Sequence, residues 1–135
     1  MKEVLVPEAI LAAIEIEARA EAPRECCGLL GGRGGRALSR YPLRNFAERP
    51  ETQYWAAPAE IIAAMRRMRE VGEELIAIYH SHPRGPARPS PTDFELAFYP
   101  EAAYLIIALE PRLEARAYRL CGGSFEEVAL TISRG

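Results

Sequence analysis

The run Glu74–His82 (ELIAIYHSH) constrains the fold more than any other part of the chain, because it is almost continuously apolar until its polar end. Such a run is typical of a strand whose two faces are both buried, so other elements must cover it on each side. A proline-rich loop follows, containing Pro83, Pro86, Pro89 and Pro91. We therefore expect a central strand whose end, next to this loop, is open to a substrate.

Helical and strand-like segments lie on either side of this run. Apolar residues at helical spacing predict helices over about Pro7–Ala22 and Pro58–Gly72, and a short helix is expected over about Pro91–Phe98. Residues 46–56 are expected to form an irregular loop or a short strand. The pattern predicts an α/β sandwich with a mixed, mainly antiparallel sheet flanked by helices. The further strands expected are Lys2–Val6, Cys26–Leu30, Ala37–Asn45, Ala103–Leu109, Glu114–Cys121 and Phe125–Ser133.

Length and charge narrow the class of protein. The chain has 135 residues, and we expect residues 1–135 to form a single domain. Its apolar runs are far shorter than the roughly 20 residues that span a bilayer, and its N-terminus lacks a signal-peptide layout, so no membrane partner is expected. The net charge of −2 shows no basic surplus for nucleic acid. A protein or small-molecule partner is the expectation.

The cysteines indicate a reduced chain. There are three, Cys26, Cys27 and Cys121, and they form no CxxC motif. Adjacent cysteines rarely pair with each other, because disulfide geometry strains the peptide between them. We therefore expect free thiols and a cytoplasmic location. By strand alternation, Cys27 should face the core and Cys26 the other side, and neither is expected to bind metal.

The two histidines of the chain, His80 and His82, stand two apart at the end of the apolar strand. Because a strand has a period of two, both imidazoles are expected on the same face. Such a pair suits Zn²⁺, and Asp93, the only aspartate, lies one loop away as a third ligand. With a water, these residues would form the open site of a catalytic zinc. Alternatively, the two histidines simply form a polar strand end.

Two more residues have both a chemical and a structural interpretation. Glu25 precedes a short strand, where it would supply the base that a zinc hydrolase needs, or would follow Pro23-Arg24 in a solvated turn. Ser90 and Asp93 have the spacing of an N-cap and its third helical residue, with Pro91 between them as the first. For Ser90 the two interpretations are compatible, because a capped helix start also determines where Asp93 points.

Taken together, these residues resemble a known signature. Glu25 lies before CCGLLGG, and the HSH of His80 and His82 follows later; seven residues then separate His82 from Ser90, and two separate Ser90 from Asp93. This spacing is similar to that of the JAMM (MPN+) zinc metalloproteases, and the length resembles their small stand-alone prokaryotic members. The resemblance implies the MPN fold, which is related to that of cytidine deaminases.

The resemblance also implies a role for each residue. His80, His82 and Asp93 would bind Zn²⁺, Glu25 would be the general base and then the acid, and Ser90 would donate a hydrogen bond to the oxyanion. The reaction would be hydrolysis of a peptide or isopeptide bond at the Gly-Gly tail of a ubiquitin-like protein, among them the prokaryotic sulfur carriers. The oligomeric state is left open.

Two other functions compete with this interpretation. One is a non-catalytic MPN scaffold, but such relatives lose the metal ligands that this chain keeps. The other is a zinc hydrolase of the nucleoside deaminase type, whose signature needs H-x-E and P-C-x-x-C. In this chain His80 is followed by Ser81-His82, and Cys26 is adjacent to Cys27. The peptidase interpretation is therefore favoured.

Overall fold

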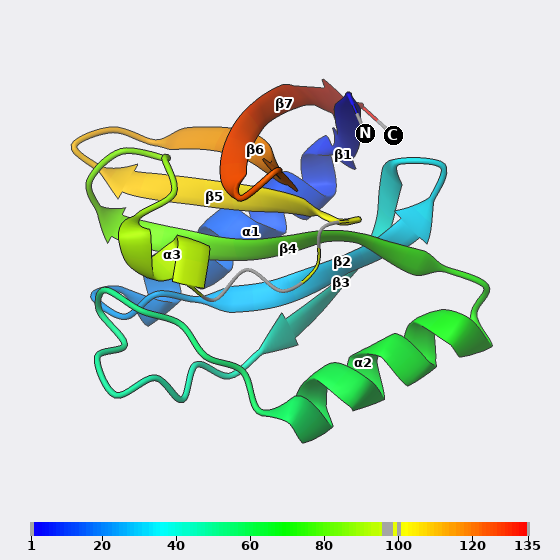
Figure 1. The fold of residues 1–135 in the computed structure, drawn as a ribbon, viewed down its shortest axis with the longest axis horizontal. Helices are drawn as coiled ribbons and strands as arrows, with labels where there is room; N and C mark the ends of the chain where they lie inside the picture. The colour runs from blue at the N-terminus through cyan, green and yellow to red at the C-terminus, as the bar shows by residue number, and fades with distance from the viewer. Residues whose placement is uncertain (1, 96–98, 100, 135) are drawn as a thin grey trace.

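The computed structural model describes residues 2–95, 99 and 101–134 (Figure 1). No helix in these ranges is both long and apolar enough to span a bilayer. In chain order the elements are β1 (Glu3–Pro7), α1 (Glu8–Glu21), β2 (Cys27–Arg33), β3 (Arg36–Leu43), α2 (Pro58–Glu70), β4 (Glu74–Arg84), α3 (Pro91–Glu95), β5 (Ala103–Glu110), β6 (Glu114–Cys121) and β7 (Ser124–Ser133).

The strands pair in the order β1-β3-β2-β4-β5-β6-β7, and β1 closes this sheet into a barrel by pairing with β7 as well. The pairs β2–β3, β2–β4, β5–β6 and β6–β7 are antiparallel, whereas β4–β5 and both pairs of β1 are parallel. The predicted mixed, mainly antiparallel sheet with flanking helices is confirmed. Nothing in the strand pattern predicts the closure, because it joins the two ends of the chain.

The two faces of the sheet bury separate apolar clusters. On one face, Ile14 of α1 packs in a cluster that contains Tyr79 of β4 and Leu105 of β5. On the other face, Met68 of α2 belongs to a cluster that contains Ile78 of β4. Figure 1 shows α1 behind the sheet and α2 on its near side. The predicted central strand is thus covered on both faces, as its apolar sequence requires.

Several boundaries differ from the sequence prediction by one to three residues; β4, for example, continues past His82 to Arg84. The glycines at 31 and 32 predict an early end for the second strand, but β2 continues through them to Arg33. The hairpin turns instead at Gly34 and Gly35, which have positive φ angles that suit glycine. The short helix expected over Pro91–Phe98 is described as α3 up to Glu95, and residues 96–98 of that prediction lie outside the described residues.

Candidate metal centre

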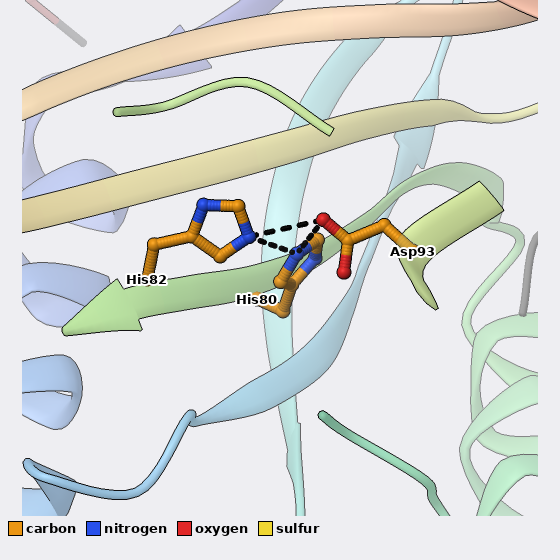
Figure 2. Close-up of side chains that lie close together, drawn as sticks. All are labelled: His80, His82 and Asp93. Carbon is orange, nitrogen blue, oxygen red and sulfur yellow. Dashed lines mark hydrogen bonds and ion pairs between the residues drawn. The ribbon is translucent and has the colours of Figure 1, made fainter. Parts of the chain in front are cut away.

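His80, His82 and Asp93 converge at the end of β4 (Figure 2). The Nε2 atoms of the two histidines are 3.2 Å apart. Asp93 Oδ2 lies 3.2 Å from the Nε2 of His80 and 3.0 Å from that of His82. All three residues are buried. The structure therefore brings together the three residues that the sequence predicts as ligands, and their facing atoms form a nearly regular triangle.

The triangle has the dimensions of a metal site. Tetrahedral ligands at about 2.0–2.1 Å from zinc are about 3.3 Å from one another, close to the separations observed here. His82 Nδ1 lies 2.9 Å from the carbonyl oxygen of Pro86, which can only accept. Nδ1 therefore carries the proton, and the Nε2 lone pair is left for a metal. The three facing atoms can lie this close only with a proton or a metal cation between them, because their lone pairs otherwise repel each other.

The local electrostatics agree with this arrangement. Burial lowers the pKa of His80, which favours the neutral ring that a metal needs. Burial alone would raise the pKa of Asp93, but hydrogen bonds from His80 and His82 outweigh it and hold that pKa below its usual range. Burial opposes charging of His82, yet its contact with Asp93 raises its pKa in the metal-free protein. Metal binding would therefore displace a proton.

Ser90 and Asp93 form the predicted helix cap. The Ser90 N–H donates to Asp93 Oδ2 at 2.8 Å, and the Asp93 N–H donates to Ser90 Oγ at 3.1 Å. The same Oδ2 faces both histidines, so one oxygen serves the cap and the ligand triangle, while the buried Oδ1 has no partner among the described residues. The hydroxyl of Ser90 accepts one hydrogen bond and keeps its own hydrogen free to donate.

Glu25 is buried, with only 3% of its surface exposed. The solvated turn considered for it is therefore wrong. Burial raises the pKa of its carboxyl to about 8, with a lowering effect from His82 and a further rise from Asp93. Its Oε1 is buried and finds no partner among the described residues. An unpaired, buried carboxyl beside a metal triangle is typical of a group placed for proton transfer.

Two buried residues that the sequence did not single out hold Glu25 in place. Ser81 Oγ accepts from the N–H of Cys26 at 2.7 Å, and the Ser81 N–H donates to the Cys26 carbonyl at 3.0 Å. Asn45 Nδ2 donates to the Glu25 carbonyl at 3.0 Å. Ser81 ties the Glu25 segment to the strand that carries both histidines. The position of Ser81 between the two histidines could have identified it from the sequence, whereas nothing near Asn45 in the sequence indicates its role.

Two cavities lie near the triangle. A cleft of about 470 Å³ is lined by Glu25, His82 and Ser90. A second cavity of about 370 Å³ is almost wholly apolar. Tyr54 lines it and stacks on the His80 ring at 4.4 Å between centroids. The five predicted site residues therefore meet at one place: three in the triangle, and Glu25 and Ser90 in the wall of the cleft beside it.

The cysteines lie outside this group. Cys26 belongs to the cluster under α1 and Cys27 to the cluster under α2, so the two face opposite sides as predicted. The sequence predicts only Cys27 toward the core, but both lie in apolar clusters because the strand is covered on both faces. Both thiols are free, and burial raises the pKa of each to about 12. A protonated, buried thiol is a poor metal ligand.

Comparison with known families decides the relationship. The family described as prokaryotic homologs of the JAB domain matches residues 7–121 of this chain. This chain belongs to the prokaryotic JAB family. The resemblance to JAMM (MPN+) proteins is confirmed by this match, and the metal-binding character of the triangle agrees with it.

Three curated relatives are similar to this chain over most of their own length. A Thermus thermophilus protein named as a TtuB-protein conjugate cleaving protease is 38% identical, over 94% of this chain and 81% of its own length. A Haloferax volcanii desampylase is 29% identical, over 93% and 90%. A Mycobacterium tuberculosis CysO-cysteine peptidase is 37% identical, over 89% and 84%.

Solved structures agree with the fold. A protein of Desulfitobacterium hafniense, determined in solution, is 33% identical and superposes with a TM-score of 0.88 over 98% of this chain and 94% of its own. A JAB1/MPN domain protein of Archaeoglobus fulgidus superposes with a TM-score of 0.63 over 96% and 95%, at 19% identity. The expected MPN fold is confirmed.

Proposed function

We propose that this chain is a zinc-dependent peptidase or isopeptidase that hydrolyses an amide bond at the C-terminal tail of a ubiquitin-like protein, with residues 1–135 acting as one catalytic domain. The observation that carries this proposal is the pairing of the ligand triangle with the buried, unpartnered carboxyl of Glu25. A metal site that was purely structural would need no such carboxyl.

The substrate class rests on the relatives. Their names describe cleavage of TtuB conjugates, of sampylated proteins and of CysO-cysteine. TtuB, CysO and the sampylation proteins are ubiquitin-like sulfur carriers. A sulfur-carrier protein with a Gly-Gly tail is therefore the proposed partner. The three free thiols suit a reducing compartment, which is the basis for placing the enzyme in the cytoplasm.

We assign the metal as zinc and its ligands as His80, His82 and Asp93. Two imidazoles and one carboxylate suit zinc, and three protein ligands leave the fourth position open, as catalytic zinc requires. When bound, zinc lowers the pKa of water and polarises a carbonyl. Its positive charge also favours the ionised form of Glu25, which brings that carboxyl toward the state of a base at neutral pH.

Glu25 moves the proton and Ser90 stabilises the developing charge. The Glu25 carboxylate takes a proton from the attacking water and returns it to the nitrogen that leaves, so the amide C–N bond breaks and a carboxylate and an amine are formed. Glu25 and Ser90 line the same cleft. From there the free hydroxyl hydrogen of Ser90 reaches the carbonyl oxygen as it becomes negative.

A test uses a carrier protein that ends in Gly-Gly and is joined through its last glycine to a second amine. The zinc-loaded chain should release the carrier, a chelator should stop release, and added zinc should restore it. A matched carrier ending in Ala-Ala should turn over much more slowly, because an extended tail must bring its carbonyl to a buried triangle and Gly-Gly leaves room that Cβ atoms would fill. Release that is equal in the presence of chelator would overturn the proposal.

A further inference from the structure

The two cavities near the triangle differ in chemistry. The cavity beside His80 is apolar, with Trp55 and Ile78 in its wall. The cleft beside His82 is charged, since Glu51, Arg84 and Arg88 line it together with Glu25. A substrate that crosses the triangle must therefore place one part on an apolar surface and the other part among charges.

The position of Glu25 determines which part is which. In the proposed reaction Glu25 delivers a proton to the departing nitrogen, so the leaving group occupies a hollow that Glu25 lines. Among the described residues Glu25 lines two hollows, and the cleft of about 470 Å³ is the one that also contains His82 and Ser90, so the leaving group is placed there. The tail that keeps the carbonyl then extends toward the apolar cavity next to Tyr54. The charged residues of the cleft accordingly face the leaving group and not the carrier.

Arg84 is the charged residue best placed to contact that group. His80, His82 and Arg84 alternate along β4, and each pairs in register with β5, so all three side chains leave the same face of the strand. The Cα atoms of His82 and Arg84 are about 6.6 Å apart at strand spacing, within the length of an arginine side chain. Arg84 thus extends the row of metal ligands into the cleft.

Arg84 and Arg88 are also unused by the fold. Both are exposed, and neither forms an ion pair with any side chain that the structure describes. Glu51 is the acidic residue on the cleft wall besides Glu25. Two guanidinium groups against one exposed carboxylate leave the cleft suited to an anion, and the planar fork of arginine matches a carboxylate.

We propose that Arg84, supported by Arg88, binds the free α-carboxylate of a single amino acid that leaves from the carrier tail. This inference rests on the proposed function and names its leaving group. In an amino acid the α-carboxylate lies two bonds from the scissile nitrogen, whereas an isopeptide-linked lysine side chain has no carboxylate there. The enzyme therefore prefers to remove one C-terminal residue. Water adds to the carbonyl, the C–N bond breaks, and the released nitrogen takes the proton from Glu25.

The test compares two forms of one substrate: a Gly-Gly carrier extended by one cysteine, as the free acid or as the C-terminal carboxamide. For the zinc-loaded wild type, the KM of the free acid should be roughly tenfold lower, the scale of one charge-assisted hydrogen-bond pair. Arg84→Met should raise the KM of the free acid by about as much and leave kcat and the carboxamide unchanged.

Arg134→Met is the matched control, because Arg134 is exposed, directly follows β7 and is not among the residues that line the cleft. It should change neither KM. Equal KM values for the two forms in the wild type would overturn the inference and leave the proposed function standing. A rise in KM shared by both forms in Arg84→Met would also overturn it, because it would place Arg84 on the carrier. Failure to cleave either form would overturn both proposals.

Discussion

Tyr79 and His80 are neighbours on β4, and both are fully buried. Their side chains lie on opposite faces of the strand, and each belongs to a cluster of polar residues. The two clusters differ in how completely their hydrogen bonds are satisfied. On the face of Tyr79, the polar side chains of the cluster bind one another. Tyr79 donates to Glu17 Oε1 at 2.6 Å, and Arg40 forms an ion pair with the same oxygen at 2.7 Å. This group joins α1, β3 and β4.

On the face of His80 the polar atoms are left without partners. Glu25 Oε1, His80 Nδ1 and Asp93 Oδ1 are buried and unpartnered among the described residues. Each buried polar atom without a hydrogen bond lowers the stability of the fold by about 1–3 kcal/mol. Three such atoms at one place are therefore unfavourable for stability. The comparison teaches that the satisfied group holds the fold, and that the unsatisfied group is kept for chemistry.

The largest effect is expected from His80→Ala combined with His82→Ala. The triangle loses both nitrogens, so the variant should bind no zinc and its turnover should fall to the uncatalysed rate. Elemental analysis and the carrier-release assay measure these two outcomes. Undiminished zinc in this variant would assign the metal to other residues and break the comparison.

The next largest effect is expected from Glu25→Gln, which keeps the size of the side chain but cannot take a proton. Turnover should fall by about 10²–10⁴-fold, while zinc content stays at the wild-type level because the three ligands are untouched. Full activity in this variant would remove Glu25 from the reaction, even with the zinc site intact.

Glu25 also predicts a pH dependence of the metal-free protein. Its pKa is raised to about 8 in the folded state, so between its ordinary value and about 8 the folded chain binds more protons than the unfolded chain. The free energy of unfolding should therefore decrease as pH rises through this window. Denaturant titrations with chelator should show this decrease in the wild type and a smaller one in Glu25→Gln. An equal decrease with pH in the two proteins would contradict the raised pKa of Glu25.

Ser90→Ala separates catalysis from capping. As an oxyanion donor, Ser90 should contribute about 10²–10³-fold to turnover, whereas the loss of its cap bond to the Asp93 N–H should cost about 1 kcal/mol of stability. We expect both effects, because the hydroxyl accepts from Asp93 and keeps its hydrogen free. A stability loss with unchanged turnover per folded molecule would restrict Ser90 to the cap.

The smallest effect on turnover is expected from Tyr79→Phe, on the satisfied face. This variant leaves Glu17 without one donor, so the free energy of unfolding should decrease by about 1–3 kcal/mol. Zinc content and turnover per folded molecule should equal those of the wild type. A large loss of turnover here would show that the two faces are not separate in function.

Part of the site follows from sequence alone. The period of a strand places His80 and His82 on one face, and the cap spacing brings Asp93 to a defined position after Ser90. The burial of Glu25 does not follow, because it depends on Ser81 and on a loop distant in sequence. Local patterns report neighbours along the chain, and these contacts are made across it.

The fold shows the same division. The apolar run of β4 predicts a central strand covered on both faces, and the structure has one. Barrel closure through β1 and β7, and the contacts of Asn45 within the loop that follows it, pair distant residues without any periodic signal.

X-ray absorption at the zinc edge tests the central claim most directly, because it reports which atoms bind the metal. The wild-type chain reconstituted with zinc should hold one ion, surrounded by nitrogen and oxygen at about 2.0–2.1 Å with the scattering pattern of two imidazoles. The unsatisfied face of β4 would then be the metal centre. A shell of sulfur at about 2.3 Å, or the absence of bound zinc, would contradict it.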